Sequence, residues 1–471
     1  MRIGIVLGLV GLWAMAGNGA EPGAGLQAGW AEVDITPVVE GERPVYLAGF
    51  GMNRKARGVH DPLMARAVVL DDGRKRLAIV SVDLVGLQHP TVRAIREQLH
   101  EWTYVLVAST HNHQGPDVIG IWGRGPLHRG VDDAYLTQVV EKVVTCVRRA
   151  AEHLAPVQSR YGTARDDALL HDTRLPVVKD GVLRVVRFDE MDQSRPAGLL
   201  VQWNCHPESL GRENRLITAD FPWATVAALR RRYGCPVVYL SGALGGLMTN
   251  PPTIQDEQGQ ELADGSFEYA RVYGEKVAQL AQQAIDQAQP ITLVPLEVFT
   301  QPITVPVDNA LYRAARAVGV LQREALVWTG DWRQPGPPMT VETSDRRSAV
   351  TSEVAYLRLG ELDVACIPGE LYPELVYGDF PMQPEAGVDF PDAPPEPPVA
   401  QILPQPRWLL VGLANDELGY IIPKRQWDKA PPYAYGKENG QYGEINSCSP
   451  DIAPIVMAAL KACVAQATAD R

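Results

Sequence analysis

The chain has 471 residues, of which 46% are hydrophobic and 21% are charged, an ordinary composition for a globular protein. This length suffices for one large or two ordinary domains with a sizeable core. The formal net charge of -12 argues against a nucleic-acid-binding surface, because such surfaces are basic.

The N-terminus has the pattern of a secretory signal peptide. A positive charge at Arg2 precedes an apolar stretch over residues 3–15, and small residues follow up to Ala20. Because the apolar stretch is short for a membrane span, we predict a signal peptide over residues 1–20. The protein is then expected to be exported, either to a periplasm or out of the cell. An uncleaved N-terminal anchor is the alternative.

Apolar runs and turn residues divide the rest of the chain into strands and helices. Strands are predicted over residues 27–37, 63–70, 77–82, 103–108, 183–188, 198–203, 236–240, 293–307, 354–359, 363–367 and 408–413. Helices are predicted over residues 90–99, 132–153, 223–232, 268–285, 308–326 and 454–466. This order of elements predicts an α/β fold.

Residues 27–471 show no internal repeat and no clear linker, so we predict a single large catalytic domain. Residues 381–406 hold many prolines and acidic residues and are predicted to form a semi-rigid surface excursion outside the core. The Gly-rich loop 241–246, SGALGG, lacks the Lys-Ser/Thr of a P-loop. It is predicted to serve close backbone packing near the site, and not to bind phosphate.

The stretch TYVLVASTHNHQGPDVIG, residues 103–120, places two histidines directly after an apolar strand. In extended backbone the side chains of His111 and His113 point to the same side. Ligand sites of open α/β sheets lie at such strand ends, so this H-x-H pair is a candidate metal site. A polar loop with two solvent-exposed histidines is the alternative, because short motifs match by chance.

Three further segments end in residues that can bind metal or transfer protons: His206, Glu370 and the region of Tyr420. Imidazole, carboxylate and an open position are what a catalytic zinc site needs. Each also has a structural alternative. His206 precedes a proline and suits a loop, Glu370 follows Pro-Gly and suits a helix cap, and Tyr420, like Tyr442, suits half-buried packing.

The segments ASTHNHQGPD, QWNCHPESLG, IPGELYP, GLANDELGYIIP and QYGEINS occur in an order that resembles the neutral/alkaline, non-lysosomal ceramidases. The matching family segments have the forms S-T-H-T-H-S-G-P, N-W-F-A-x-H-P, P-G-E-F, G-L-x-N…Y-x-x-x-P and Y-E-G-A-S. The likeness runs from about Gly29 to the C-terminus. It implies a neutral-ceramidase catalytic-domain-like fold, an α/β architecture with a large mixed β-sheet core and flanking helices.

The resemblance also implies site residues. His111, His206, Glu370 and Tyr420 resemble the four ligands of one zinc ion (Zn2+, one per chain). His113 resembles the residue that handles the proton and positions the scissile group. Tyr442 resembles the tyrosine that stabilises the oxyanion, and Arg174 resembles a pocket arginine, with a surface salt bridge as its alternative.

The segments around the two predicted histidine ligands depart from the family pattern. HNHQGPD stands where the family has H-T-H-S-G-P-G, and QWNCHPESLG where it has N-W-F-A-x-H-P-T, so the pocket rim differs. Longer ceramidases continue into a β-sandwich domain beyond the position of helix 454–466, so the sequence is expected to be a short member.

We therefore expect an exported zinc-dependent amidohydrolase that acts on ceramide or a related N-acyl lipid. One alternative is a zinc hydrolase of a different amide or ester, and another is a non-catalytic binding protein on the same scaffold. The expected partner is a small-molecule or lipid substrate without nucleic acid. A transient contact with a membrane surface and the oligomeric state stay open.

Overall fold

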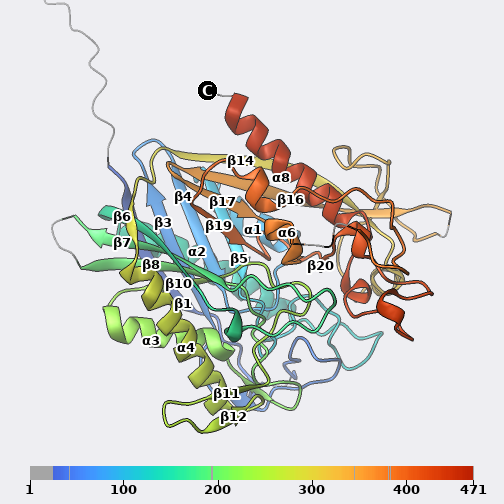
Figure 1. Ribbon diagram of the computed structural model, residues 1–471, viewed down its shortest axis with the longest axis horizontal. Coiled ribbons are helices and arrows are strands. Elements are labelled where there is room, and N and C mark those ends of the chain that lie inside the picture. Colours follow the sequence, from blue (N-terminus) through green and yellow to red (C-terminus); the bar gives the residue numbers. More distant parts are fainter. Residues whose placement is uncertain are drawn as a thin grey trace, which may run out of the picture.

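A computed structural model describes residues 25–41, 43–191, 195–343, 345–379, 381 and 383–469 of the chain. Figure 1 shows sheets that are covered on their outer faces by helices. The signal peptide predicted over residues 1–20 lies outside the described residues.

Nine strands of the described chain form one mixed sheet with the order β10-β8-β7-β6-β1-β3-β4-β5, in which β13 also pairs with β6. Neighbours pair antiparallel except β4 with β5 and β8 with β10, which pair parallel. The bounds are β1 Gln27–Asp34, β3 Met64–Asp71, β4 Arg76–Val82, β5 Tyr104–Ser109, β6 Ala155–Arg165, β7 Val182–Glu190, β8 Pro196–Trp203, β10 Val237–Ser241 and β13 Gln289–Ile291.

A second sheet has the order β14-β16-β17-β19, with β15 paired to β16. Its strands are β14 Leu296–Val307, β15 Leu326–Val327, β16 Ser348–Leu359, β17 Leu362–Cys366 and β19 Trp408–Val411. Three short pairs complete the strands of the described residues: β2 Gly58–Val59 with β9 Leu216–Ile217, β11 Thr253–Gln255 with β12 Glu261–Ala263, and β18 Glu370–Leu371 with β20 Tyr420–Ile421.

Helices close the outer faces of both sheets. Their bounds are α1 His89–Glu97, α2 Asp133–Glu152, α3 Asp220–Tyr233, α4 Phe267–Asp286, α5 Ala310–Ala317, α6 Glu374–Tyr377, α7 Val399–Ile402 and α8 Ile452–Ala469. Helices α1 and α2 pack on β1, β3, β4 and β5, α3 and α4 pack on β6, β7 and β10, and α8 lies along β14 and β16 (Figure 1). Helix α8 is apolar enough to span a membrane by length and composition, but it is a core helix whose inner side chains are buried.

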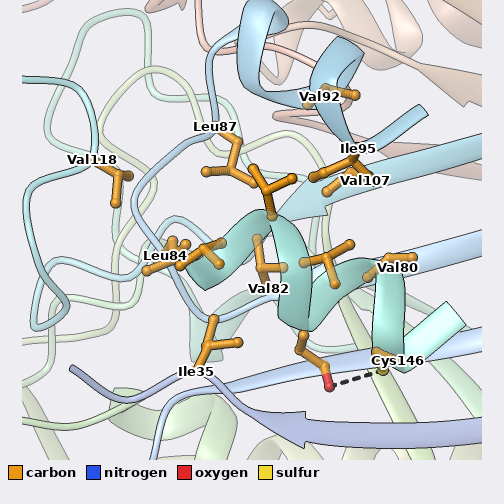
Figure 2. Close-up of a cluster of buried hydrophobic side chains, with 14 of the residues drawn as sticks. Ile35, Val80, Val82, Leu84, Leu87, Val92, Ile95, Val107, Val118 and Cys146 are labelled. Carbon is orange, nitrogen blue, oxygen red and sulfur yellow. Dashed lines mark hydrogen bonds between the residues drawn. The ribbon is translucent and has the colours of Figure 1, made fainter. Parts of the chain in front are cut away.

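The apolar core is divided among these layers. Figure 2 shows the cluster between the sheet and helices α1 and α2, which contains Val92 and Ile95 of α1, Val107 of β5, and Val80 and Val82 of β4. A separate cluster lies between the two sheets and joins side chains of β4, β5, β8 and β10 to those of β16, β17 and β19. Burying each such side chain contributes about 1.5 to 3 kcal/mol, so the strand ends that carry the site are firmly held.

The α/β class and the mixed sheet with flanking helices are confirmed, and most predicted elements lie within a few residues of their observed bounds. Asp132 caps α2 by accepting a hydrogen bond from the amide of Ala134, as such a residue should. The predicted helix over residues 308–326 is too long. Helix α5 ends at Ala317 because Gly319 has a φ of 75°, which breaks the helix.

The excursion predicted over residues 381–406 is not wholly at the surface. Val399 and Ile402 of α7 are buried, and Leu403 joins them in the cluster beneath α8. The prolines around them end the local helix without removing these apolar side chains from the core, which is why composition alone gave the wrong location for this part.

Candidate metal centre and cavity

His111 stands two residues after the end of β5. Its amide donates to the carbonyl of Leu84 over 3.0 Å, and its φ of 67° is rare for a residue with a side chain. The ring Nδ1–H donates to the carbonyl of Val85 over 2.6 Å. A carbonyl only accepts, so this bond fixes the tautomer and leaves Nε2 with a lone pair for a metal.

His206 is held in the same way at the end of β8. Its amide and its ring Nδ1–H both donate to the carbonyl of Met248, over 2.9 and 2.8 Å. The side chain is fully buried. Its Nε2 atom is therefore also left as the ligand atom, oriented by a backbone carbonyl.

Glu370 and Tyr420 are direct neighbours in the parallel pair of β18 and β20. The amide of Glu370 donates to the carbonyl of Gly419 over 3.1 Å. One carboxylate oxygen, Oε2, lies 2.9 Å from Nε2 of His206 and 3.4 Å from Nε2 of His111. The segment that follows β17 of the second sheet thus brings a carboxylate to the two imidazoles that follow strands of the first sheet.

Potential ligand atoms of His111, His206 and Glu370 all lie within 4.8 Å of one another. Burial by itself would raise the pKa of Glu370, but the two imidazoles outweigh it and hold that pKa well below its usual range. Two nitrogens and one oxygen with further positions open are a donor set that fits a catalytic zinc ion. The residues present therefore suit the metal that the resemblance implies.

His111 and Glu370 line a cavity of about 810 Å³, which is within the range of small-molecule sites, and the fully buried His206 contacts Glu370. Part of its wall is apolar and includes Ile119, Ile121, Trp122 and Leu321. The polar part includes His113, Glu208, Glu417 and Tyr442. The cavity offers an apolar surface for a chain and polar groups around a candidate metal.

Two solved structures share this architecture. The crystal structure of neutral ceramidase from Pseudomonas aeruginosa matches with a TM-score of 0.70 and 16% identity, over 95% of this chain and 75% of that chain. A ceramidase complexed with C2 matches with a TM-score of 0.68 and 15% identity, over 95% of this chain and 76% of that chain. The fold is that of the neutral ceramidases. No protein-family model matches the sequence.

Within this neutral-ceramidase fold, the two predicted tyrosines line the same cavity. The ring of Tyr420 lies 6.3 Å from that of His206 and 5.9 Å from that of Tyr442. Tyr442 is 48% exposed at the cavity. Burial, with Glu370 and Glu208 nearby, raises the pKa of Tyr442 to about 12, so its hydroxyl keeps a proton that it can donate. Their roles as ligand and oxyanion donor stay predictions.

Arg174 contacts the backbone of Tyr442 but is not among the described residues that line the cavity. Its guanidinium makes two hydrogen bonds to the carboxylate of Glu444, of 3.0 and 2.7 Å, and a third to the carbonyl of Tyr442, of 2.7 Å. Both partners of the ion pair are at most 3% exposed. Because the pair is buried, it is not a surface salt bridge, and a role of Arg174 in the pocket stays a prediction.

The structure adds two carboxylates that the sequence did not single out. Glu208 follows His206 by two residues, and its Oε1 lies 2.9 Å from Nδ1 of His113. Glu417 also lines the cavity, and its buried Oε2 has no hydrogen-bond partner among the described residues. Both residues stand inside segments that resemble the family, QWNCHPESLG and GLANDELGYIIP, and that position was the available signal for them.

The glycines of the loop 241–246 serve close packing, as predicted. A Cβ on Gly242 would lie 2.2 Å from Oδ1 of Asn204, and one on Gly245 would lie 2.7 Å from the carbonyl of Glu370. Larger residues at these positions would push the strands of His206 and Glu370 apart.

Proposed function

We propose that this protein is an exported zinc-dependent amidohydrolase that cleaves the N-acyl amide bond of ceramide or a related N-acyl lipid. The observation that carries this proposal is the convergence of His111, His206 and Glu370 within 4.8 Å, beside a large cavity, in a fold shared with neutral ceramidases. Tyr420, the register neighbour of Glu370, is the proposed fourth ligand.

When bound, a zinc ion would supply polarisation of the amide carbonyl and lower the pKa of a water molecule. The other steps belong to side chains around the cavity. His113 accepts the proton of the attacking water and returns it to the amine that leaves. The protonated hydroxyl of Tyr442 donates to the carbonyl oxygen as it gains negative charge.

The shape of the cavity supports a substrate with an acyl chain. Ile119, Ile121, Trp122 and Leu321 form apolar wall next to the polar end. Burial of such a chain is favourable by about 0.8 kcal/mol per CH₂ group. A ceramide or another N-acyl lipid would therefore direct its acyl chain along this wall and its amide toward the metal.

One alternative has a specific observation in its favour. Glu208 and Arg212 line the same cavity, so its lining is charged as well as apolar. A water-soluble amide or ester that pairs with these groups is the second candidate substrate. A non-catalytic binding protein is the candidate from another class.

A metal analysis combined with a substrate panel tests these functions. The purified protein should contain one zinc ion per chain and release fatty acid from labelled ceramide. Cleavage of soluble acyl amides or esters without ceramide turnover would favour the second candidate. Absence of both stoichiometric zinc and turnover of every substrate would favour the binding protein.

Export rests on the leader sequence and is tested separately. The full chain, expressed in a bacterium with a secretion system, should lose residues 1–20 and appear outside the cytoplasm. N-terminal sequencing of the mature protein measures the cleavage site. A mature protein that begins at Met1 and stays in the cytoplasm would contradict the assignment.

A further inference from the structure

Glu208 and His113 form a contact beside the candidate metal centre that the resemblance does not imply. Oε1 of Glu208 lies 2.9 Å from Nδ1 of His113, and both side chains line the cavity. The family segment has threonine after His-Pro, where this chain has Glu208. The carboxylate is therefore a feature of this chain.

The His113 ring has no hydrogen bond at either nitrogen among the described residues, although it is largely buried. Nδ1 and Oε1 therefore meet at hydrogen-bond distance without forming a hydrogen bond. Buried polar atoms of this kind nearly always find partners, so a small rotation of the imidazole toward Glu208 is favourable.

The ring is confined on its other sides. A Cβ on Gly49 would lie 2.4 Å from Nδ1 of His113, so only glycine leaves room there. The ring of Phe50 meets the imidazole edge-on at 5.4 Å, and the ring of His111 lies 4.7 Å away. With these neighbours in place, rotation of the ring is limited and Glu208 is the carboxylate within reach.

Glu208 is itself held by the turn that carries a candidate metal ligand. Its amide donates to the carbonyl of His206 over 2.9 Å, and its carbonyl accepts from the amide of Gly211 over 2.9 Å. The turn thus presents an imidazole toward the metal centre and a carboxylate toward His113. The relative position of the two is set by backbone hydrogen bonds.

We propose that Glu208 is a positioning residue that accepts the Nδ1–H of His113 and so keeps Nε2 unprotonated toward the cavity. This inference rests on the proposed function. Nε2 then takes a proton from water as its oxygen bonds to the amide carbon. As the C–N bond breaks, Nε2–H passes that proton to the nitrogen, and a carboxylic acid and an amine result. A carboxylate that fixes a histidine tautomer is an established arrangement in hydrolases.

The test compares Glu208→Gln with the wild-type protein in the presence of zinc. Glutamine has the same shape without the charge, and its amide group satisfies either tautomer of His113. We expect kcat for amide hydrolysis to fall about 10- to 100-fold, with little change in KM or zinc content. In a His113→Gln background the same substitution should cause no further loss, because the carboxylate acts through that ring.

Glu213→Gln is the matched control, since Glu213 is exposed in the same loop. Imidazole ¹⁵N spectra of histidine-labelled protein, with His113 assigned from His113→Gln, should show the Nδ1–H tautomer in the wild type and its loss in Glu208→Gln. An unchanged tautomer, or an equal loss of kcat in both backgrounds, would overturn the proposal. If the wild type hydrolyses no amide, the proposed function fails, and the spectra still decide the contact.

Discussion

At the scale of single residues, the site depends on how each imidazole is oriented. The Nδ1 atoms of His111 and His206 donate to backbone carbonyls, so both Nε2 atoms face Glu370. At His111 this orientation requires a φ of 67°, a conformation that costs roughly 1 to 3 kcal/mol. Backbone strain of this kind occurs mostly at functional sites.

Ligand and donor roles are separable by substitution. His206→Ala should lose both zinc and turnover, because it removes one of three clustered donors. Tyr442→Phe should keep the zinc and lower kcat by about 10²- to 10³-fold, the usual loss when one oxyanion donor is removed. Metal analysis and kinetics on both variants measure this, and full activity in Tyr442→Phe would contradict the oxyanion role.

Glu374 should make stability depend on pH. Burial, with Asp172 nearby, raises the pKa of Glu374 from 4.5 to about 8. Between these values the folded protein holds a proton that the unfolded chain has released, so the contribution of Glu374 to stability falls as pH rises through this window. Glu374→Gln removes the titration.

The free energy of unfolding of Glu374→Gln, relative to the wild type, should therefore be higher at pH 8 than at pH 5. Urea unfolding of both proteins at the two pH values measures the change. A difference between the two proteins that is the same at both pH values would show that Glu374 has an ordinary pKa.

At the scale of elements, the loop that carries Tyr442 is held by hydrogen bonds to residues outside the cavity lining. The guanidinium of Arg174 bonds to Glu444 and to the carbonyl of Tyr442, and the side chain of Gln441 bonds to the backbone of Leu175 in both directions. A cation–π contact with Tyr372 adds to this. The position of the Tyr442 hydroxyl therefore depends on a residue that lies outside the cavity.

Arg174→Met should destabilise the protein by about 3 to 5 kcal/mol, because Glu444 is left buried without its charged partner. It should also lower kcat, since the Tyr442 loop is released. The double variant Arg174→Met/Glu444→Leu is the matched control and should recover much of the stability, because no unpaired charge remains. Urea unfolding and kinetics measure both effects. A fully stable and active Arg174→Met would refute this role.

At the scale of the whole molecule, the candidate metal centre joins the two sheets. His111 and His206 follow strands of the first sheet, whereas Glu370 follows β17 of the second. Between the sheets, the shared apolar cluster sets their relative position before any metal binds. A bound ion would add a link between parts of the chain that are far apart in sequence.

Removal of zinc by a chelator should therefore lower the Tm, and added zinc should restore it. The expected stabilisation is about 2.7 kcal/mol when free zinc exceeds its Kd a hundredfold. Calorimetry of the metal-free protein with and without zinc measures the shift. The Tm of His206→Ala should not change when zinc is added. A wild-type Tm that also stays the same would contradict a site of this kind.

Much of the fold was predictable because local patterns determine local elements. The apolar run before Ser109, the Asp132 cap and the turn at Gly73 each predicted the element that the structure contains. What the sequence did not predict are contacts with residues that lie far away in the chain. Val399 and Ile402 are buried by α8, and Arg174 is bound by Glu444, which no local pattern indicates.

The sequence by itself determined the α/β class, most strands and helices, and the residues that resemble zinc ligands. Only the tertiary structure decided that His111, His206 and Glu370 meet, that Arg174 lies behind Tyr442, and that Glu208 reaches His113. The physical reason is that periodicity and turn chemistry act over a few residues. Distances between side chains that lie far apart in the sequence depend instead on how two sheets pack through a shared core.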